Sequence, residues 1–286
     1  MILITGAAGK TGKQLLQTLV TRGESVRCFV RNAVQQDELL NLGAREVVLG
    51  DLMNAESVQA AFAGVKSVYH ICPNVSPDEV KIGRLVIAAA QDNALERFVY
   101  HSVLHPQVEA MPHHWAKMQV EGLIFQSGLQ YTILQPAAYM QNVHGYWQKM
   151  MSDGVYAIPY AVTSRSSMVD LREVAQVAAM VLCDSGHAYA TYELCGLEWL
   201  SAVDITAIIS RVTGKEIHAE RLDPVYWEVE ARNSGMRAYA VETLLKMFYY
   251  YENYDFIGNG NQLGWLLGRA PTRFETFVQQ MAAEKS

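Results

Sequence analysis

Short apolar runs alternate with amphipathic stretches through the first half of the chain. The apolar runs are rich in β-branched and aromatic residues and predict buried strands at residues 2–5, 25–30, 46–49, 67–71, 97–100 and 131–134. The amphipathic stretches between them predict helices at residues 12–22, 33–42, 55–63, 79–93 and 112–127. Strands and helices that alternate at this spacing indicate βαβ units, which have right-handed crossovers and build a parallel sheet.

The pattern changes after Pro136. The second half predicts a strand near residues 167–169, a tyrosine-rich segment at residues 248–256, and helices at residues 141–151, 171–183 and 202–213. We therefore predict an α/β fold, with a Rossmann-type, doubly wound parallel sheet whose NAD(P)-binding core spans residues 1–136. Residues 137–286 are expected to form a smaller α/β lobe, interleaved with the core, that binds a substrate or a partner.

A glycine-rich loop follows the first predicted strand and has the sequence Gly6-Ala7-Ala8-Gly9-Lys10-Thr11-Gly12. Gly6 would permit a tight turn, Gly9 would let the backbone approach a pyrophosphate, and Gly12 would let the helix pack closely on the strand. The helix N-terminus adds N–H groups and a favourable dipole, so the predicted phosphate site also includes Ala8, Lys10 and Thr11. A glycine turn without a ligand is the alternative, but the place of the loop at the first βα turn favours a dinucleotide site.

The ends of the second and third strands indicate which dinucleotide binds. A site specific for NAD usually has an acid after the second strand, whereas this chain has Arg31 and Asn32 there. A guanidinium can hold a 2′-phosphate with two parallel bonds, so we predict that NADP(H) is preferred and that NAD(H) is the alternative cofactor. Arg31 could also be an ordinary surface residue. Asp51 and Leu52 would lie beside the adenine, although Asp51 could instead cap the following helix.

Composition narrows the class of protein. Half of the 286 residues are apolar and 18% are charged, which is typical of a globular protein, and the net charge of −6 argues against direct nucleic-acid binding. The widely spaced cysteines favour reduced thiols over a metal site or a disulfide framework; they are Cys28, Cys72, Cys183 and Cys195. No apolar run approaches the ~20 residues that span a bilayer, and Met1 leads straight into a strand. We therefore expect a cytoplasmic protein that does not enter a membrane.

With this loop and these strand ends, the chain resembles the atypical short-chain dehydrogenase/reductases, and more narrowly their NmrA-like branch. The branch includes triphenylmethane dye reductases, quinone reductases and catalytically silent NADP sensors. Further matching segments are Lys117 with Glu121, residues 127–129, residues 131–136, residues 139–142, residues 169–175 and residues 267–272. The resemblance covers nearly the whole chain and does not identify a substrate.

The resemblance implies roles for three positions. Lys117 matches the active-site lysine of the family, which contacts the nicotinamide ribose, and Ser102 occupies the family's serine position after the fifth strand. Four residues before Lys117, however, the chain has His113 where the family's tyrosine would stand. The phenol that usually protonates a carbonyl substrate is therefore missing, which argues against ordinary ketone reduction.

His113 and Lys117 are four residues apart on a helix that Pro112 would begin, so their side chains share a face. A cationic Lys117 would disfavour protonation of His113, and the neutral imidazole could still donate a hydrogen bond or a proton. His113 and His114 could equally be ordinary polar residues of a first helical turn. Tyr139 is a second candidate proton donor, or an aromatic side chain in the wall of a pocket.

The C-terminal half is unusually aromatic. Residues 248–256, followed by a glycine- and asparagine-rich turn at residues 258–261, could wall a flat apolar pocket with Tyr139, Trp147, Trp227 and Trp265. The competing interpretation is ordinary core or a dimer contact. Thr272 and Glu275 fit a capping box that would begin the last helix.

Hydride transfer to a ketone needs an acid for the developing alkoxide, whereas a cationic dye, an iminium ion or a quinone methide needs less help. The leading hypothesis is therefore an NADPH-dependent reductase of a small conjugated or aromatic electrophile, such as a quinone, cationic dye, iminium ion or enone. The alternative is a non-catalytic NADP(H)-binding redox sensor that acts through a protein partner, and a sugar-nucleotide epimerase ranks third. The sequence leaves open a homodimer or a regulatory partner.

Overall fold

The computed structural model describes residues 1–284, which divide into two compact units. The first unit contains residues 1–107, 113–135 and 174–192. The second contains residues 108–112, residues 136–173 and the rest of the described chain from residue 193. The chain passes between the units several times, so each unit is built from segments that are distant in sequence.

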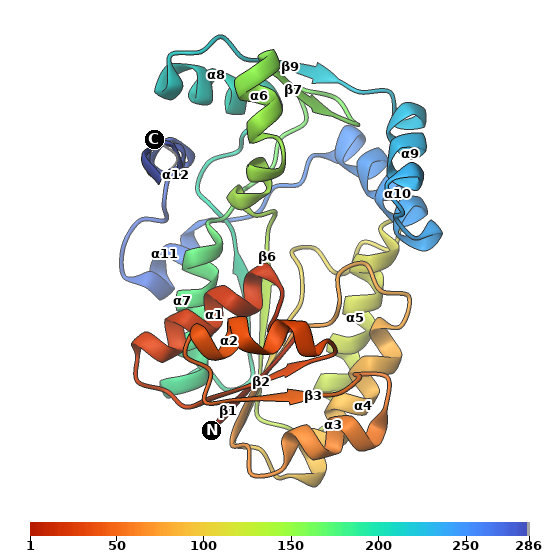
Figure 1. Ribbon diagram of the computed structural model, residues 1–286, viewed down its shortest axis with the longest axis vertical. Helices are drawn as coiled ribbons and strands as arrows, with labels where there is room; N and C mark the ends of the chain where they lie inside the picture. The colour runs from red at the N-terminus through yellow and green to blue at the C-terminus, as the bar shows by residue number, and fades with distance from the viewer. Residues whose placement is uncertain (285–286) are drawn as a thin grey trace. The chain divides into compact units, whose positions relative to one another are not determined.

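The first unit is built on a seven-stranded sheet with the strand order β3-β2-β1-β4-β5-β6-β8. Figure 1 labels β1, β2, β3 and β6 of this sheet. Its strands are β1 (Ile2–Thr5), β2 (Val26–Val30), β3 (Glu46–Leu49), β4 (Ser67–His70), β5 (Arg97–His101), β6 (Tyr131–Pro136) and β8 (Ala190–Leu194). Every pairing from β3 to β6 is parallel. The predicted α/β class with a Rossmann-type parallel sheet is confirmed.

Helices lie between successive strands, because parallel strands need a crossover connection. They are α1 (Lys10–Thr21), η1 (Ala33–Gln35), α2 (Gln36–Asn41), α3 (Ala55–Phe62), α4 (Glu79–Asp92), α5 (Pro112–Phe125) and α7 (Leu171–Cys183). One face of the sheet packs on α3, α4 and α5 through a continuous core that includes Phe62, Val86, Phe98 and Ile133. Helix α1 packs on β1 and β2 and turns Leu15, Leu16 and Leu19 inward.

The second unit has a core of its own. Its elements are η2 (Met140–Gly145), α6 (Trp147–Asp153), β7 (Val155–Ile158), α8 (Ala202–Thr213), β9 (His218–Arg221), α9 (Pro224–Asn233), α10 (Ala238–Tyr254), α11 (Asn261–Leu267) and α12 (Phe274–Glu284). Strands β7 and β9 pair in parallel, and α8 packs against α12. The core joins residues of α6, α8 and α12, including Trp147, Ile209 and Phe277.

Two predicted elements of the second half are wrong. A single helix was expected at residues 141–151. The structure instead has the 3₁₀ helix η2 followed by the separate helix α6. The two meet near Gly145, and glycine destabilises the interior of a helix. The strand expected near residues 167–169 does not form. Ser166 and Val169 instead make isolated bridges to three different segments, so no continuous ladder develops.

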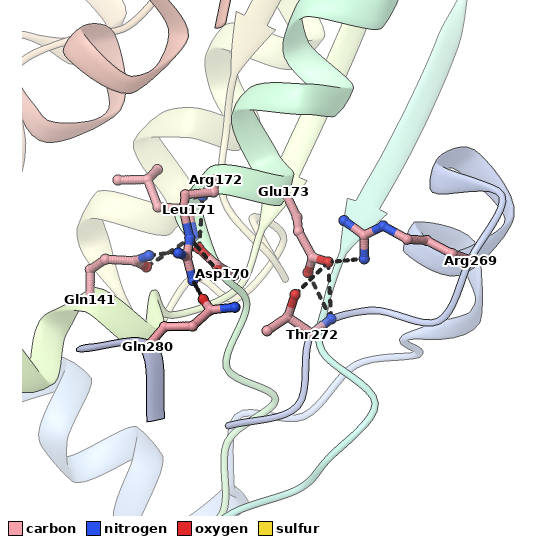
Figure 2. Close-up of polar contacts among 8 residues, drawn as sticks. All are labelled: Gln141, Asp170, Leu171, Arg172, Glu173, Arg269, Thr272 and Gln280. Atoms are coloured by element: carbon pink, nitrogen blue, oxygen red, sulfur yellow. Dashed lines mark hydrogen bonds and ion pairs between the residues drawn. The ribbon is translucent and has the colours of Figure 1, made fainter. Parts of the chain in front are cut away.

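The predicted capping box of the last helix is also wrong. The Thr272 hydroxyl donates a hydrogen bond to the buried Glu173 carboxylate at 2.8 Å, and Arg269 pairs with the same carboxylate (Figure 2). Helix α12 begins later, at Phe274, whose N–H donates to the Glu198 carboxylate at 2.8 Å. A long-range contact to Glu173 has therefore replaced the local cap.

A second buried carboxylate lies one turn earlier in the same segment. Asp170 accepts hydrogen bonds from Gln141 and Arg172, and the Arg172 guanidinium also reaches Gln280 of α12 at 2.6 Å (Figure 2). Asp170 and Glu173 together hold the closing segment of the second unit against the start of α7.

Within residues 1–284, every helix is too short or too polar to span a membrane.

Candidate functional site

The strand order places a switch point between β1 and β4. From β1 the chain proceeds toward β2, whereas from β4 it proceeds the other way toward β5. Ligands of open α/β sheets bind outside the carboxyl ends of the strands at such a point. The glycine-rich loop after β1, the segment after β4 and the end of β5 all lie there, within the first unit.

The geometry of the glycine-rich loop fits a dinucleotide cradle. Gly6 has φ of +61°, and a Cβ there would lie 2.9 Å from the Ile71 carbonyl oxygen. A Cβ on Gly12 would lie 2.6 Å from the Ala7 Cα, so only glycine allows α1 to start this close to the loop. Gly9 is exposed and forms the N-cap of α1 without a side-chain cap. The N-terminus of α1 can therefore receive an anion.

The residues predicted to select the cofactor lie at the ends of the neighbouring strands. Arg31 is exposed immediately after β2, and Asn32 caps η1 by accepting a hydrogen bond from the Val34 N–H. Asp51 is exposed after β3 and accepts a bond from Met53. The alternative role of Asp51 as the cap of α3 is wrong, because Asn54 makes that cap. Leu52 is buried in the core of the first unit.

Lys117 is held by a buried polar cluster. Its ammonium donates to the Glu79 carboxylate at 3.0 Å and to the His101 carbonyl oxygen at 3.2 Å. The same ammonium lies 5.3 Å from the centre of the Tyr100 ring, within range of a cation–π contact. The Tyr100 hydroxyl donates to Glu79 at 2.8 Å. Helix α5 begins at Pro112 as predicted, and this start sets the face on which Lys117 lies.

The charges of this cluster are set by burial and by close partners. Burial alone would raise the pKa of Glu79, but the Lys117 charge and bonds from Tyr100, Lys117 and Cys72 outweigh it and leave the pKa lowered. Burial, followed by the negative charge of Glu79, raises the pKa of Tyr100 well above its usual value. Glu79 is therefore an ionised carboxylate, and the Tyr100 phenol keeps its proton.

His70 connects the cluster to the glycine-rich loop. The Thr5 hydroxyl donates to the Ile71 carbonyl at 3.1 Å and accepts from the Ile71 N–H at 2.9 Å. Because the single hydroxyl proton is used there, we infer that the His70 Nδ1–H donates to Thr5, at 2.8 Å. His70 also stacks on Tyr100 at 5.8 Å. Its Nε2 is then an acceptor, buried and without a hydrogen-bond partner among residues 1–284.

His113 lies on the same helix as Lys117, one turn earlier. Burial, followed by the Lys117 charge, lowers the pKa of His113 to about 4, so the imidazole is neutral near pH 7. Lys117 disfavours protonation of His113 as expected, and burial, which the sequence did not indicate, is the larger cause. The ring packs edge-on against His114 at 4.4 Å, and its Nδ1 has no hydrogen-bond partner within the described chain.

Ser102 follows β5 and belongs to a second buried polar group, which includes Glu121 of α5. Its hydroxyl donates a very short hydrogen bond to Glu121, which also accepts from the Gln135 amide at 3.0 Å. Burial raises the pKa of Glu121 despite these bonds. Glu121 follows Lys117 by four residues, so α5 carries the two polar groups one turn apart.

Tyr139 belongs to the second unit, at the start of η2, where its backbone bridges Val169. Several aromatic residues of this unit pack on one another, as in the contacts of Phe248 with Trp227 and with Tyr160. Trp265, in contrast, is 76% exposed. A separate open hollow of about 440 Å³ is lined by Leu197, Trp199 and residues 257–261.

The sequence interpretation did not include Glu79, Tyr100 or His70. One signal was available for Glu79, because it falls on the apolar face of α4 with Ile82, Gly83 and Val86. An acidic residue on such a face needs a buried partner. Tyr100 and His70 had no comparable signal, because strand runs buried on both faces tolerate aromatic rings.

Among residues 1–284, no cluster of three or more acidic, histidine or cysteine side chains could hold a metal ion.

The parallel sheet and the glycine-rich loop after its first strand define a Rossmann-type α/β protein. The sequence matches the NmrA-like family over residues 1–278, and the chain belongs to that family. The resemblance stated from the sequence motifs is therefore confirmed.

Named relatives and solved structures agree with this assignment. An NAD(P)H azoreductase of Xenophilus azovorans is 28% identical over 222 residues, which cover 76% of this chain and 75% of the relative. The NADPH complex of an NADPH-dependent quinone oxidoreductase from Escherichia coli has a TM-score of 0.86 at 21% identity, covering 99% of this chain and all of that one. The NADP(H) complex of the Citrobacter sp. triphenylmethane reductase has a TM-score of 0.85 at 24% identity, covering 98% and 99%.

Proposed function

We propose that this protein is an NADPH-dependent reductase that transfers hydride to a small conjugated or aromatic electrophile. The observation that carries the proposal is the partly buried Lys117 ammonium, paired with Glu79 in the same unit as an uncapped helix N-terminus at the switch point of the sheet. The names of the azoreductase, quinone oxidoreductase and triphenylmethane reductase support the reaction class.

The site offers separate groups for each part of the cofactor. The α1 N-terminus and residues 6–12 would hold the pyrophosphate, and Arg31 would hold the 2′-phosphate. Asp51 and Leu52 would lie along the adenosine, and Lys117 would bond the nicotinamide ribose, with Ser102 immediately after the end of β5. When bound, the nicotinamide supplies a hydride, which is two electrons and one proton.

Acceptors differ in whether they need a proton in addition to the hydride. A cationic dye or an iminium ion becomes neutral when it gains hydride at carbon, so it needs no proton. A quinone becomes an oxyanion and must gain one proton. We propose that the neutral His113 imidazole donates a hydrogen bond to this oxygen in place of the missing phenol, and that water supplies the proton, with Tyr139 as the second candidate donor.

The function is tested by following NADPH oxidation with a quinone, a cationic triphenylmethane dye, an iminium ion and an enone as acceptors. We expect turnover with at least one of them. His113→Phe should slow quinone reduction by roughly tenfold to a thousandfold and leave dye reduction nearly unchanged, because only the quinone needs a proton. Equal losses with both acceptors would contradict the role of His113.

Gly9→Val is the control for specific cofactor binding. A Cβ at this exposed position would meet only the Gly6 carbonyl oxygen, at 3.3 Å, so the variant should fold while its side chain excludes the pyrophosphate. Turnover that persists in this variant would place the cofactor elsewhere.

The sensor hypothesis replaces the reductase if NADPH binds but no acceptor is reduced, and if a protein partner binds differently to the NADP⁺ and NADPH forms.

NADPH is expected to bind more tightly than NADH because of Arg31. Arg31→Asp removes a charge-assisted contact and adds repulsion, so it should weaken NADPH binding by about 2–4 kcal/mol and barely change NADH binding. Titration of the nicotinamide fluorescence with both cofactors measures the difference. Equal losses for the two cofactors would show that Arg31 does not select the 2′-phosphate.

A further inference from the structure

Glu79 occupies a place where an isolated acid would be unstable. The residue is 3% exposed, although it is the first residue of α4 and helix starts usually face solvent. Three donors converge on its carboxylate: the Tyr100 hydroxyl, the Lys117 ammonium and the Cys72 thiol. A buried carboxylate with this many donors is a fixed negative charge, because it cannot reorient without breaking several bonds.

The close approach of α4 and α5 brings Glu79 and Lys117 together. One turn along α4, Gly83 packs so tightly on α5 that a Cβ there would lie 2.8 Å from a Val120 methyl carbon. Glu79 and Gly83 are four residues apart, and Lys117 and Val120 are three apart, so both pairs lie along the same helix–helix seam. The missing side chain at Gly83 therefore sets the helix spacing at which the ion pair forms.

The Lys117 ammonium is in contact on three sides. The Glu79 carboxylate accepts one of its N–H bonds, the His101 carbonyl accepts another, and the Tyr100 ring lies beside it. An ammonium has three N–H donors, so these contacts leave one donor for a further acceptor. Without Glu79, the flexible four-carbon stem of a lysine would let the charge move to water.

We propose that Glu79 is a positioning residue, which fixes the Lys117 ammonium so that its remaining N–H bonds a hydroxyl of the nicotinamide ribose. This inference rests on the proposed function, since it gives Glu79 a task only if NADPH binds beside Lys117. Glu79 does not touch the cofactor or the substrate and acts through Lys117.

Glu79→Gln tests the inference because it removes the charge and keeps the shape. Single-turnover hydride transfer should slow by about thirtyfold, and NADPH affinity should fall by about fivefold, since the ammonium is no longer fixed. Glu79→Asp keeps the charge on a shorter stem and should recover at least half of the logarithmic loss in rate. A role limited to packing would produce no such recovery, because aspartate fills the site less well than glutamine does.

Glu173→Gln is the matched control. Glu173 is also a buried glutamate in an ion pair, with Arg269, and it lies in the second unit. Its variant should lower the melting temperature without changing the single-turnover rate of the folded protein or its affinity for NADPH. A double-mutant cycle adds a second test: in a Lys117→Met background, Glu79→Gln should change the rate less than about twofold.

The outcomes separate the two proposals. Wild-type turnover together with a Glu79→Gln variant of normal rate and normal NADPH affinity would overturn the role of Glu79 and leave the reductase intact. NADPH binding without turnover would overturn the reductase, and the role of Glu79 would then be decided by the affinities of the same variants. If Glu79→Gln does not fold, Glu79→Ala takes its place, because it removes the charge and leaves room for water to satisfy the three donors. An unchanged rate and affinity in that variant would refute the proposal. A wild type that does not bind NADPH refutes both.

Discussion

Lys117→Met is expected to slow hydride transfer by roughly a hundredfold, about 3 kcal/mol of barrier, and to lower the free energy of unfolding by about 3–5 kcal/mol. The kinetic loss follows from removing the ammonium next to the reacting ring. The loss of stability follows from Glu79, whose buried carboxylate would lose its counter-charge. Single-turnover rates and urea unfolding measure the two effects on the same preparation.

The second substitution that separates these effects is Glu79→Gln in the Lys117→Met background. The double variant should be more stable than Lys117→Met alone, because the unpaired buried charge is gone, yet it should remain as slow. A Lys117→Met variant of full stability would show that the ion pair is not buried in solution. A variant of full activity would remove Lys117 from the proposed reaction.

Acid is expected to unfold the protein well above the pH at which carboxylates are usually protonated. Burial is the main cause that lowers the pKa values of His70 and His113 to about 4 and those of His101 and His114 to about 3. In the unfolded chain a histidine titrates near pH 6.5. Between about pH 6.5 and 4 the unfolded state therefore binds more protons, so the free energy of unfolding falls as the pH is lowered.

The size of the effect is large because four histidines contribute. Each proton taken up only by the unfolded state lowers stability by about 1.4 kcal/mol per pH unit, so four together lower it by about 5 kcal/mol per unit. A domain of ordinary stability would unfold near pH 5. Glu121 opposes the trend slightly, since its pKa is raised by burial and its protonation favours the folded state.

Urea unfolding at several pH values between 5 and 8 measures this slope. His114→Asn should reduce the slope by about one proton, because it removes one buried ring that stays neutral in the folded state. Stability that does not change between pH 6.5 and 5 would mean that the buried rings are open to water in solution.

The first half of the fold could be predicted from the sequence because its elements carry strong patterns. Strands such as β1 and β4 are buried at every position, and helices such as α1 present one apolar face. The glycine-rich loop was recognisable for the same reason, since Gly6 and Gly12 are required by local backbone geometry. These features depend on residues close together in the sequence, so the sequence pattern is enough to predict them.

The second half was harder to predict because its contacts are distant in sequence. Strand β8 is only partly buried along its length and gives a weak pattern. The segment at Ser166 finds its partners near residues 200 and 256, and no nearby residue indicates either. Thr272 has a good local capping pattern, but the buried Glu173, 99 residues away, bonds it instead.

The candidate site shows the same division. Lys117 could be named as a candidate from its motif, and His113 from its place one turn before Lys117. Glu79 could not be paired with Lys117 from the sequence, because the pairing depends on the spacing that Gly83 and Val120 set between two helices. The network around a functional residue is thus a property of packing, even where the residue itself has a motif.

The four free cysteines can serve as reporters of local opening in both units. Cys28 and Cys72 are buried in the first unit and Cys195 in the second, and burial raises the pKa of each thiol, to about 12 for Cys28 and Cys195. Thiolates are the reactive form, so a neutral alkylating reagent can modify these three residues only when the surrounding structure opens. Cys183 is partly exposed and calibrates the reagent. The labelling rates of the natural thiols, measured by mass spectrometry, would therefore report how often each unit opens locally. The rate at Cys72 would report the opening of the polar cluster around Glu79.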